Sequence, residues 1–310
     1  MEKDSTNVHD PIDKALDSRN RLLNSDLAGL SGMGADNLDY FMSCWRNAEA
    51  QRRIQVISGL VNLSEEDFAL DFSGIFKLCL QDPEEQVRIK SIEGLEFEDK
   101  YIFVTPIIKI LKTDESEKVR FTAIRALGKF ALLAEQGNFS EIIAQDIFTA
   151  LLSILENTKE SMPMRRQALE SVAPFHDELI ASYIEDFYYS EDPEVKVSAI
   201  ISMGRNCDSR WLDFLIDEMR SEVAQFRFES AQASGEIDDE ELVPYLIDLL
   251  HDSENQVREA AIRSLGKIGG TKAKTTLQDL LQDPNSLIKE EAQYALRELL
   301  ACEDPLSLNP

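Results

Sequence analysis

The chain has 310 residues, with 32 basic and 58 acidic side chains and a formal net charge of −26. Nucleic acid is therefore excluded as an expected partner, because duplex affinity comes largely from basic residues that replace counterions on phosphates. An anionic membrane is disfavoured for the same reason. The four cysteines lack the spacing of a metal site or a disulfide framework, and no secretory or long apolar segment occurs. We expect a cytoplasmic protein.

The chain begins with a polar stretch, and residues 1–10 are predicted to be disordered. In residues 11–37, apolar side chains such as Ile12, Leu16, Leu23 and Leu27 recur at near-helical intervals, and glycines follow at 32 and 34. We predict a capping helix and a linker here. Its polar face carries both signs of charge, which disfavours a helix lying on a membrane surface.

Residues 38–300 contain eight copies of one pattern, each anchored on a residue that is followed by a basic side chain. The anchor pairs are Arg52/Arg53, Val87/Arg88, Val119/Arg120, Met164/Arg165, Val195/Lys196, Phe226/Arg227, Val257/Arg258 and Ile288/Lys289. Successive anchors are 35, 32, 45, 31, 31, 31 and 31 residues apart. Such a fixed period is typical of a repeat protein.

The residues after each anchor follow a helical period. Val257, Ala261 and Leu265 fall four and eight residues apart, which places them on one stripe of a helix. The position seven residues after the anchor is small in every copy: Gly59, Gly94, Ala126, Ser171, Ser202, Ala233, Ser264 and Ala295. A column of small residues allows a neighbouring helix to approach closely.

A second amphipathic stretch precedes each anchored helix, so each unit is predicted to be a helix, a tight turn and a second helix. Two such helices cannot bury both apolar faces alone, and stacking them into a solenoid solves this. The run Asp-Ser-x-x-x-Val-Arg-x-x-Ala-Ile-x-x-Leu-Gly at 252–266 resembles the HEAT repeat. The short period is most similar to the HEAT-like units of the phycobilisome bilin lyases. The resemblance implies an all-α, right-handed α-solenoid of about eight repeats.

HEAT proteins are expected to have a structural ladder in which an Asp of the inter-helix turn and an Arg six residues later connect adjacent repeats. The matching pairs are Asp82/Arg88, Asp114/Arg120, Asp252/Arg258 and Asp283/Lys289. These aspartates are also predicted to be helix N-caps, with Pro83 or Pro284 in the first helical position. In four repeats other residues occupy the Asp position, and there the ladder is either broken or supplied by a nearby acid such as Asp192.

The 45-residue interval contains an insertion at about 132–147. It is predicted to lengthen the second helix of one repeat and the first helix of the next, with a Gly-Asn turn at 137–138 between them. Extra length of this kind maps to one face of a repeat stack, where it serves either binding or elongation alone. The C-terminal tail, residues 301–310, is predicted to be disordered.

In the HEAT family the second helix of each repeat lines the concave surface. The positions three, six and ten residues after each anchor are therefore expected to face a partner, and they carry equal numbers of acidic and basic residues. We place the partner-binding site among Lys90, Phe97, Arg125, Lys129, Arg205, Arg263 and Lys267. A mixed groove inside an acidic shell suits a protein or peptide, and a basic partner would complement the shell.

Catalytic signatures are scarce. The three histidines, His9, His176 and His251, each precede an aspartate, but they lie in separate parts of the repeat array. The glycines at 266, 269 and 270 follow a helix and are assigned to capping its end. We therefore expect a non-enzymatic scaffold or adaptor without cofactor or metal. The alternative is an enzyme accessory subunit or lyase of the bilin-lyase type, which rests on the resemblance alone.

Overall fold

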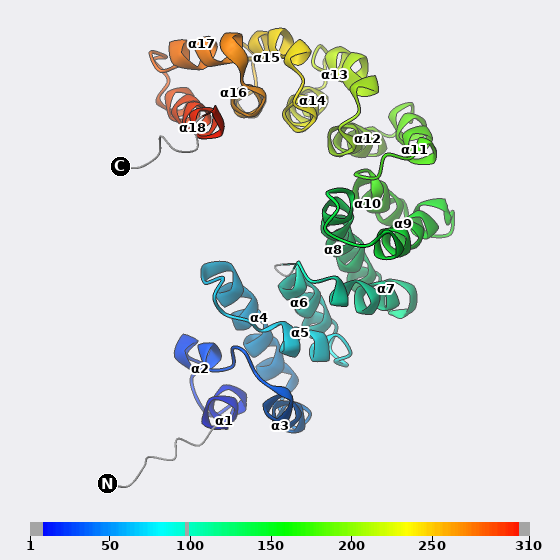
Figure 1. The fold of residues 1–310 in the computed structure, drawn as a ribbon, viewed down its shortest axis with the longest axis vertical. Helices are drawn as coiled ribbons and strands as arrows, with labels where there is room; N and C mark the ends of the chain where they lie inside the picture. Colours follow the sequence, from blue (N-terminus) through cyan, green and yellow to red (C-terminus); the bar gives the residue numbers. More distant parts are fainter. Residues whose placement is uncertain (1–8, 97–98, 304–310) are drawn as a thin grey trace. The chain divides into compact units, whose positions relative to one another are not determined.

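The computed structural model describes residues 9–96 and 99–303, and regular structure in these residues is entirely helical (Figure 1). The chain forms two compact units, residues 1–153 and residues 154–310, each built from stacked pairs of helices. Because each apolar helix face is covered by the next pair, each unit is an all-α solenoid, as the repeat pattern predicts.

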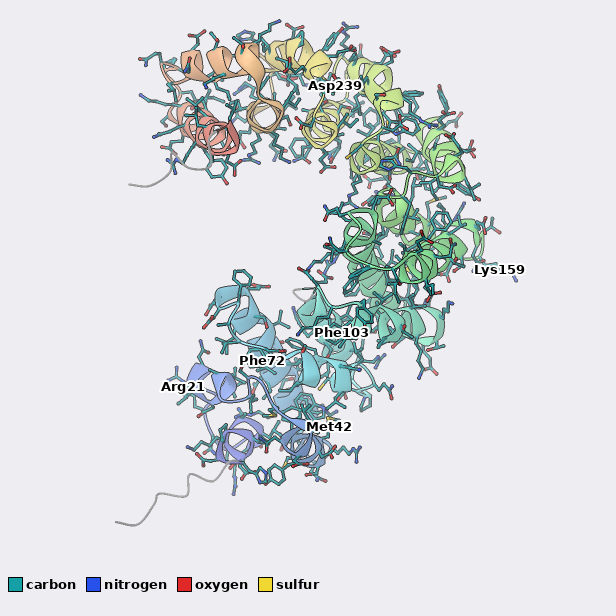
Figure 2. All side chains as sticks on the ribbon, viewed as in Figure 1. Arg21, Met42, Phe72, Phe103, Lys159 and Asp239 are labelled. Carbon is teal, nitrogen blue, oxygen red and sulfur yellow. The ribbon has the colours of Figure 1, made fainter. Side chains whose placement is uncertain are left out.

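The first unit has short helices at its N-terminal end and longer ones behind them. Its elements are α1 (Asp10–Leu16), α2 (Asn24–Ala28), α3 (Ala35–Trp45), α4 (Ala50–Glu66), α5 (Ser73–Cys79), α6 (Glu85–Leu95), η1 (Tyr101–Phe103), α7 (Val104–Thr113) and α8 (Glu117–Glu135). The second helices α4, α6 and α8 contact one another in sequence, and the first helices α5 and α7 pack against α6 and α8. Phe72 and Phe103 are buried here (Figure 2).

The second unit repeats the same arrangement more regularly. Its elements are α10 (Met162–Val172), α11 (Glu178–Tyr188), α12 (Pro193–Asn206), η2 (Ser209–Trp211), α13 (Leu212–Glu218), α14 (Ala224–Ile237), η3 (Glu240–Leu242), α15 (Val243–Leu249), α16 (Asn255–Ile268), α17 (Gly270–Leu280) and α18 (Ser286–Glu303). The helices α10, α12, α14, α16 and α18 form the second-helix layer, and α11, α13, α15 and α17 pack on them.

Helix α9 (Glu141–Glu156) follows α8 across the predicted insertion. The turn before it contains Gly137 at a φ of +79°, a left-handed conformation that glycine adopts without steric cost. The insertion is therefore a lengthened α8, a turn and a lengthened α9, as the sequence indicates.

Small residues let the second helices approach one another. A Cβ added to Gly235 on α14 would lie 2.6 Å from Ser264 Oγ and 3.0 Å from Ser264 Cα on α16. Gly204 and Gly266 make the same close approach to Ala233 and Ala295 of the following helix. The capping role predicted for Gly266 is therefore wrong, because this residue packs against the next repeat. Gly269 and Gly270, at φ values of +67° and +77°, do occupy the turn between α16 and α17.

The N-terminal segment differs from the single capping helix predicted for it. It forms two short helices, α1 and α2, because Asp17 accepts hydrogen bonds from the backbone and guanidinium of Arg19 and turns the chain between them. Arg52 holds this cap by donating to the Ala15 carbonyl at 2.7 Å and the Asn20 carbonyl at 3.1 Å.

The helix N-caps and the two chain ends also differ in part from the sequence predictions. The predicted N-cap aspartates stand two residues too early: Asp82 accepts from the Glu84 backbone N–H at 2.9 Å, and Glu84, not Asp82, is the N-cap of α6. Pro83 and Pro284 consequently precede their helices. The predicted disorder of residues 1–8 and 304–310 falls outside the described chain. Disorder was wrong for His9 and Asp10, the N-cap and first residue of α1, and for residues 301–303, which belong to α18.

Candidate protein-binding face

The turns of adjacent repeats are joined by arginine–aspartate ion pairs. In the first unit Arg53 Nε lies 3.1 Å from Asp82 Oδ2, and Arg88 Nε lies 2.7 Å from Asp114 Oδ2. Arg88 also donates to the carbonyl of Asp82, the aspartate six residues before it, at 2.9 Å. Each arginine therefore fixes its own turn through a backbone carbonyl and the next repeat through a carboxylate.

The second unit contains the same pair between Arg227 and Asp252, at 2.6 Å. The Arg227 hydrogen bond lowers the pKa of Asp252, although partial burial opposes the shift. At the C-terminal end, Arg258 donates to the Asp252 carbonyl and to the Asn255 side chain. Asp283 accepts from the Asn285 backbone at 2.7 Å, and Lys289 makes no ion pair with any described residue.

Arg120, the remaining predicted ladder member, donates to the Asp114 carbonyl at 3.3 Å. In the repeat with Ser221 at the aspartate position, a different acid takes the place of the turn aspartate. Lys196 Nζ lies 2.6 Å from Glu218 Oε1, which also accepts from the Tyr188 hydroxyl at 2.7 Å. The acid is thus Glu218 at the end of α13. Asp192, suggested from the sequence, instead caps α12. The sequence did not indicate Glu218, because its position beside Lys196 depends on where α13 ends.

The side of the second-helix layer that faces away from the first helices is called the helix-B face below; it consists of the positions three, six and ten residues after each anchor. In the first unit its cations meet acids of a neighbouring repeat. Arg125 Nη2 on α8 lies 3.3 Å from Glu96 Oε1 and 3.8 Å from Glu93 Oε1. Lys129 Nζ lies 2.8 Å from Asp99 Oδ1 and also donates to the Glu96 carbonyl.

Lys90 joins this group through Glu93, with 2.7 Å between Nζ and Oε2. Burial raises the pKa of Glu96, while the Arg125 charge and hydrogen bond oppose that shift. Lys90, Arg125 and Lys129, predicted separately from the sequence, are therefore brought together around two glutamates. Phe97, predicted beside them, lies outside the described residues.

In the second unit the predicted cations alternate with acids. Arg205 on α12 donates to the Glu170 carbonyl at 2.9 Å, and its Nη1 lies 3.8 Å from Glu170 Oε2. Arg263 on α16 lies 3.0 Å from Glu291 on α18. Desolvation raises the pKa of Glu236, and the positive charges of Arg205 and Lys267 oppose the shift. Lys267 makes no ion pair among the described residues.

The helix-B face also carries a buried acid that the sequence did not single out. Glu229 on α14 is 9% exposed and accepts a hydrogen bond from Gln225 at 2.5 Å. Burial raises its pKa, and the hydrogen bond from Gln225 opposes the shift. With Glu170, Arg205, Glu236 and Lys267 it forms a strip of mixed charge, whose chemistry suits hydrogen bonding and ion pairing with a protein surface.

Two of the three histidines make separate contacts within the repeats, and the third, His251, is exposed. His9 stacks on Tyr40 with ring centroids 3.8 Å apart, and the His176 Nε2 lies 2.8 Å from the Asn206 carbonyl. Across residues 9–96 and 99–303 no group of histidine, cysteine or acidic side chains converges as metal ligands would. The same residues include no helix long and apolar enough to cross a membrane.

Comparison with protein-family models matches residues 212–297 to the HEAT repeats family. Comparison with curated proteins finds no match. Among solved structures, importin beta is 13% identical over 94% of this chain and 46% of its own, with a TM-score of 0.51. Kap95p, solved in complex with RanGDP, is 14% identical over 94% of this chain and 44% of its own, with a TM-score of 0.52. At these identities the similarity is one of fold.

The complex of CpcE and CpcF of phycocyanin lyase from Nostoc sp. PCC7120 is 16% identical over 73% of this chain and 94% of that chain. Its TM-score of 0.47 is too low to support a specific relationship to the lyases. The helical pairs and the family match together confirm the repeat type read from the sequence. Residues 212–297 match the HEAT repeats family, and the stacked helix pairs of the other repeats are consistent with the same repeat type.

Proposed function

We propose that this chain is a non-enzymatic scaffold or adaptor that binds a protein partner on its helix-B face. The observation that supports this most directly is the regular column of polar side chains on successive second helices, tied together by ion pairs between repeats. Stacked repeats present such columns as an extended surface, which is how repeat proteins bind. Kap95p, which shares the fold, binds RanGDP.

The chemistry of the face favours a protein over a polyanion. A polyanion requires cations that can replace its counterions. Here Arg125, Lys129, Arg205 and Arg263 already contact acids of neighbouring repeats. A protein partner can instead exchange these contacts for its own hydrogen bonds and ion pairs. With a net charge of −26, the chain would steer a basic partner toward it at low salt.

The test is affinity capture from the native host's lysate with the wild-type chain and with the Arg125→Ala/Lys129→Ala/Arg205→Ala variant. Because exposed ion pairs contribute about 0–1 kcal/mol each, the variant should remain folded. We expect a stoichiometric protein that the variant captures much less. A matched control replaces three exposed cations outside this face, Arg21, Lys159 and Lys272, with alanine and should capture the partner normally.

Capture at low and high salt separates two ways of binding. A partner held by the acidic exterior should be released by salt, whereas one held in the helix-B face should resist it. Equal capture by the triple variant and the wild type would reject the placement on this face. The alternative function, an accessory subunit or lyase of the bilin-lyase type, predicts that the purified chain retains a chromophore, and the absorption spectrum of the same eluate reports it.

A further inference from the structure

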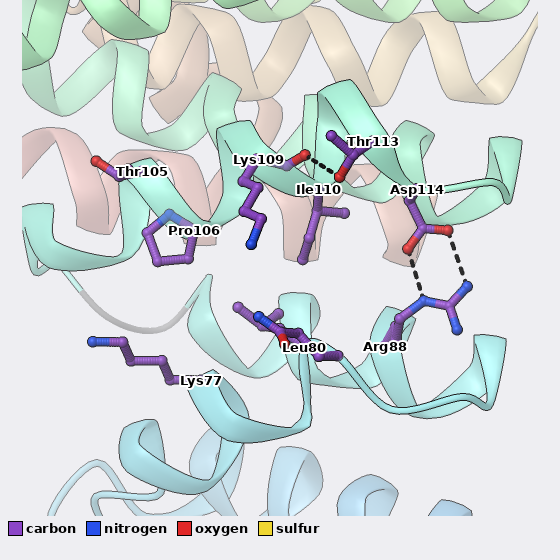
Figure 3. Close-up of a pocket in the computed structure, with 10 residues that line it drawn as sticks. Lys77, Leu80, Arg88, Thr105, Pro106, Lys109, Ile110, Thr113 and Asp114 are labelled. Atoms are coloured by element: carbon purple, nitrogen blue, oxygen red, sulfur yellow. Dashed lines mark hydrogen bonds and ion pairs between the residues drawn. The ribbon is translucent and has the colours of Figure 1, made fainter.

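Two adjacent grooves lie in the first-helix layer of the first unit, away from the helix-B face. One, of about 570 Å³, lies between α3 and α5. The other, of about 420 Å³, lies between α5 and α7 and is shown in Figure 3. Lys77 and Gln81 line both grooves, so the two grooves form one continuous strip across three helices.

The acids that line these grooves are already neutralised. Asp114 pairs with Arg88 at 2.7 Å, which closes one end of the second groove in Figure 3, and Asp82 pairs with Arg53 at 3.1 Å. Three other lining cations, Arg46, Lys77 and Lys109, are exposed and make no ion pair among the described residues. Each groove therefore carries unpaired positive charge although the chain as a whole is strongly acidic.

Four exposed or half-buried cations on the second helices of this unit differ from these three. On the second helices of the same unit, Lys90, Lys118, Arg125 and Lys129 each contact a carboxylate. A cation without a partner gains most from a new carboxylate, because it gives up no existing ion pair. The strip of Arg46, Lys77 and Lys109 is thus the part of this unit best prepared to accept negative charge.

Between the cations the grooves have apolar walls. Leu78 is 39% exposed and, with Met42, lines the first groove. Leu80, Pro106 and Ile110 line the second, and Figure 3 shows Lys109 extending from α7 across the gap toward α5. Grooves of this volume accept side chains of a ligand and bury apolar surface on its entry. A ligand that fits combines carboxylates with apolar side chains.

We propose that this strip, from Arg46 through Lys77 to Lys109, binds an extended acidic peptide segment of a partner protein. Its carboxylates pair with the three cations, and its intervening apolar side chains enter the two grooves. The apolar walls favour a peptide over nucleic acid, which would offer phosphate but no aliphatic side chain. This surface is separate from the helix-B face to which the scaffold function is assigned. Because its test uses synthetic peptides and not the captured partner, either proposal can fail without the other.

The test measures fluorescence anisotropy of labelled synthetic peptides with the full chain. The first peptide alternates Asp and Glu with Leu and Phe, the second has Ser in place of Leu and Phe, and the third has Lys in place of Asp and Glu. We expect the first to bind best. Lys77→Glu/Lys109→Glu should weaken its binding at least about tenfold, because like charges then oppose the peptide carboxylates. Leu78→Ser should also weaken it.

The matched control is Lys272→Glu, which makes the same charge change on α17 of the second unit and should leave peptide affinity unchanged. Circular dichroism should show that every variant is folded, since these lysines have no ion-pair partner to lose. The proposal is overturned by no binding of the first peptide up to about 0.1 mM, or by equal affinity of the double variant. Equal binding of the Ser-containing peptide or of a single-stranded oligonucleotide would overturn it as well, because charge alone would then explain the attraction.

Discussion

Arg227 on α14 donates two hydrogen bonds to the carboxylate of Asp252 in the next repeat, from Nε at 2.6 Å and from Nη2 at 2.9 Å. Its third nitrogen, Nη1, donates to the carbonyl of Ser221 at 2.9 Å. The side chains are 14% and 6% exposed, so solvent screens the pair weakly. One arginine thereby sets both the turn before its own helix and the position of the following repeat.

Asp252→Ala should destabilise the second unit by about 3 kcal/mol, because it leaves the Arg227 guanidinium largely buried without its carboxylate. Urea unfolding followed by circular dichroism measures the change. Replacing both partners, as in Arg227→Met/Asp252→Leu, should recover most of the loss, since no uncompensated charge remains. If the single and double variants are equally destabilised, the ion pair is not the cause.

The same pair predicts a dependence of stability on pH. The Arg227 hydrogen bond lowers the pKa of Asp252 below its usual 3.8, despite the opposing effect of burial. The stabilisation is therefore fully present above the unfolded-state pKa and is lost as pH falls through the lower folded-state value. The stability difference between the wild type and Asp252→Asn should be constant from about pH 7 to about pH 5 and shrink toward about pH 2. A difference that stays constant down to the lowest pH would contradict this.

Gly235→Ala should destabilise the second unit by up to about 2 kcal/mol, because overpacking usually costs about 1–3 kcal/mol and the helix preference of alanine offsets part of it. The added Cβ would lie 2.6 Å from Ser264 Oγ and 3.0 Å from Ser264 Cα, so the backbone of α16 must move. The gain that alanine offers over glycine within a helix is only roughly 1 kcal/mol. Gly34→Ala is the control, because nothing lies within 4 Å of its added Cβ and its φ of −75° suits alanine. Thermal unfolding compares the two variants.

Glu229→Gln should stabilise the chain at neutral pH. Burial raises the pKa of Glu229 above its usual 4.5. The folded state is therefore more stable while Glu229 is protonated, and the free energy of unfolding falls as pH rises from the unfolded-state pKa through the folded-state pKa. At pH 7 the buried charge is a cost, and glutamine keeps the acceptor for Gln225 without it. Calorimetry should show a Tm higher by about 2–4 °C at pH 7 and little difference near about pH 4. The exposed-residue control Glu191→Gln should show no change at either pH, and a Glu229→Gln variant that is less stable at pH 7 would reject this account of the buried acid.

Much of the fold follows from the sequence because it depends on contacts within one repeat. The anchors, the small residues seven positions later and the long α8 and α9 can all be located by counting along the chain. The two short helices α1 and α2 could not be located in this way, because the break between them depends on local hydrogen bonds of Asp17 with Arg19.

The site depends on contacts between repeats, which one sequence does not reveal. The pairing of Arg125 with Glu96 and of Arg263 with Glu291 joins residues 29 and 28 positions apart, and it requires the register of adjacent helices. The predicted cations were placed on the helix-B face, but their neutralisation by acids of other repeats was missed. Glu218, which replaces the missing turn aspartate, and the unpaired Lys77 and Lys109 were missed for the same reason.

The central claim, a partner bound on the helix-B face, is tested most directly by amine footprinting of the chain alone and in its captured complex. Lys267 on α16 lies on that face, and Lys272 on α17 lies in the first-helix layer; both are exposed and without an ion pair among the described residues. The proposed binding mode predicts that acetylation of Lys267 falls several-fold in the complex while that of Lys272 is unchanged. Protection of Lys272 with Lys267 still fully reactive would contradict it.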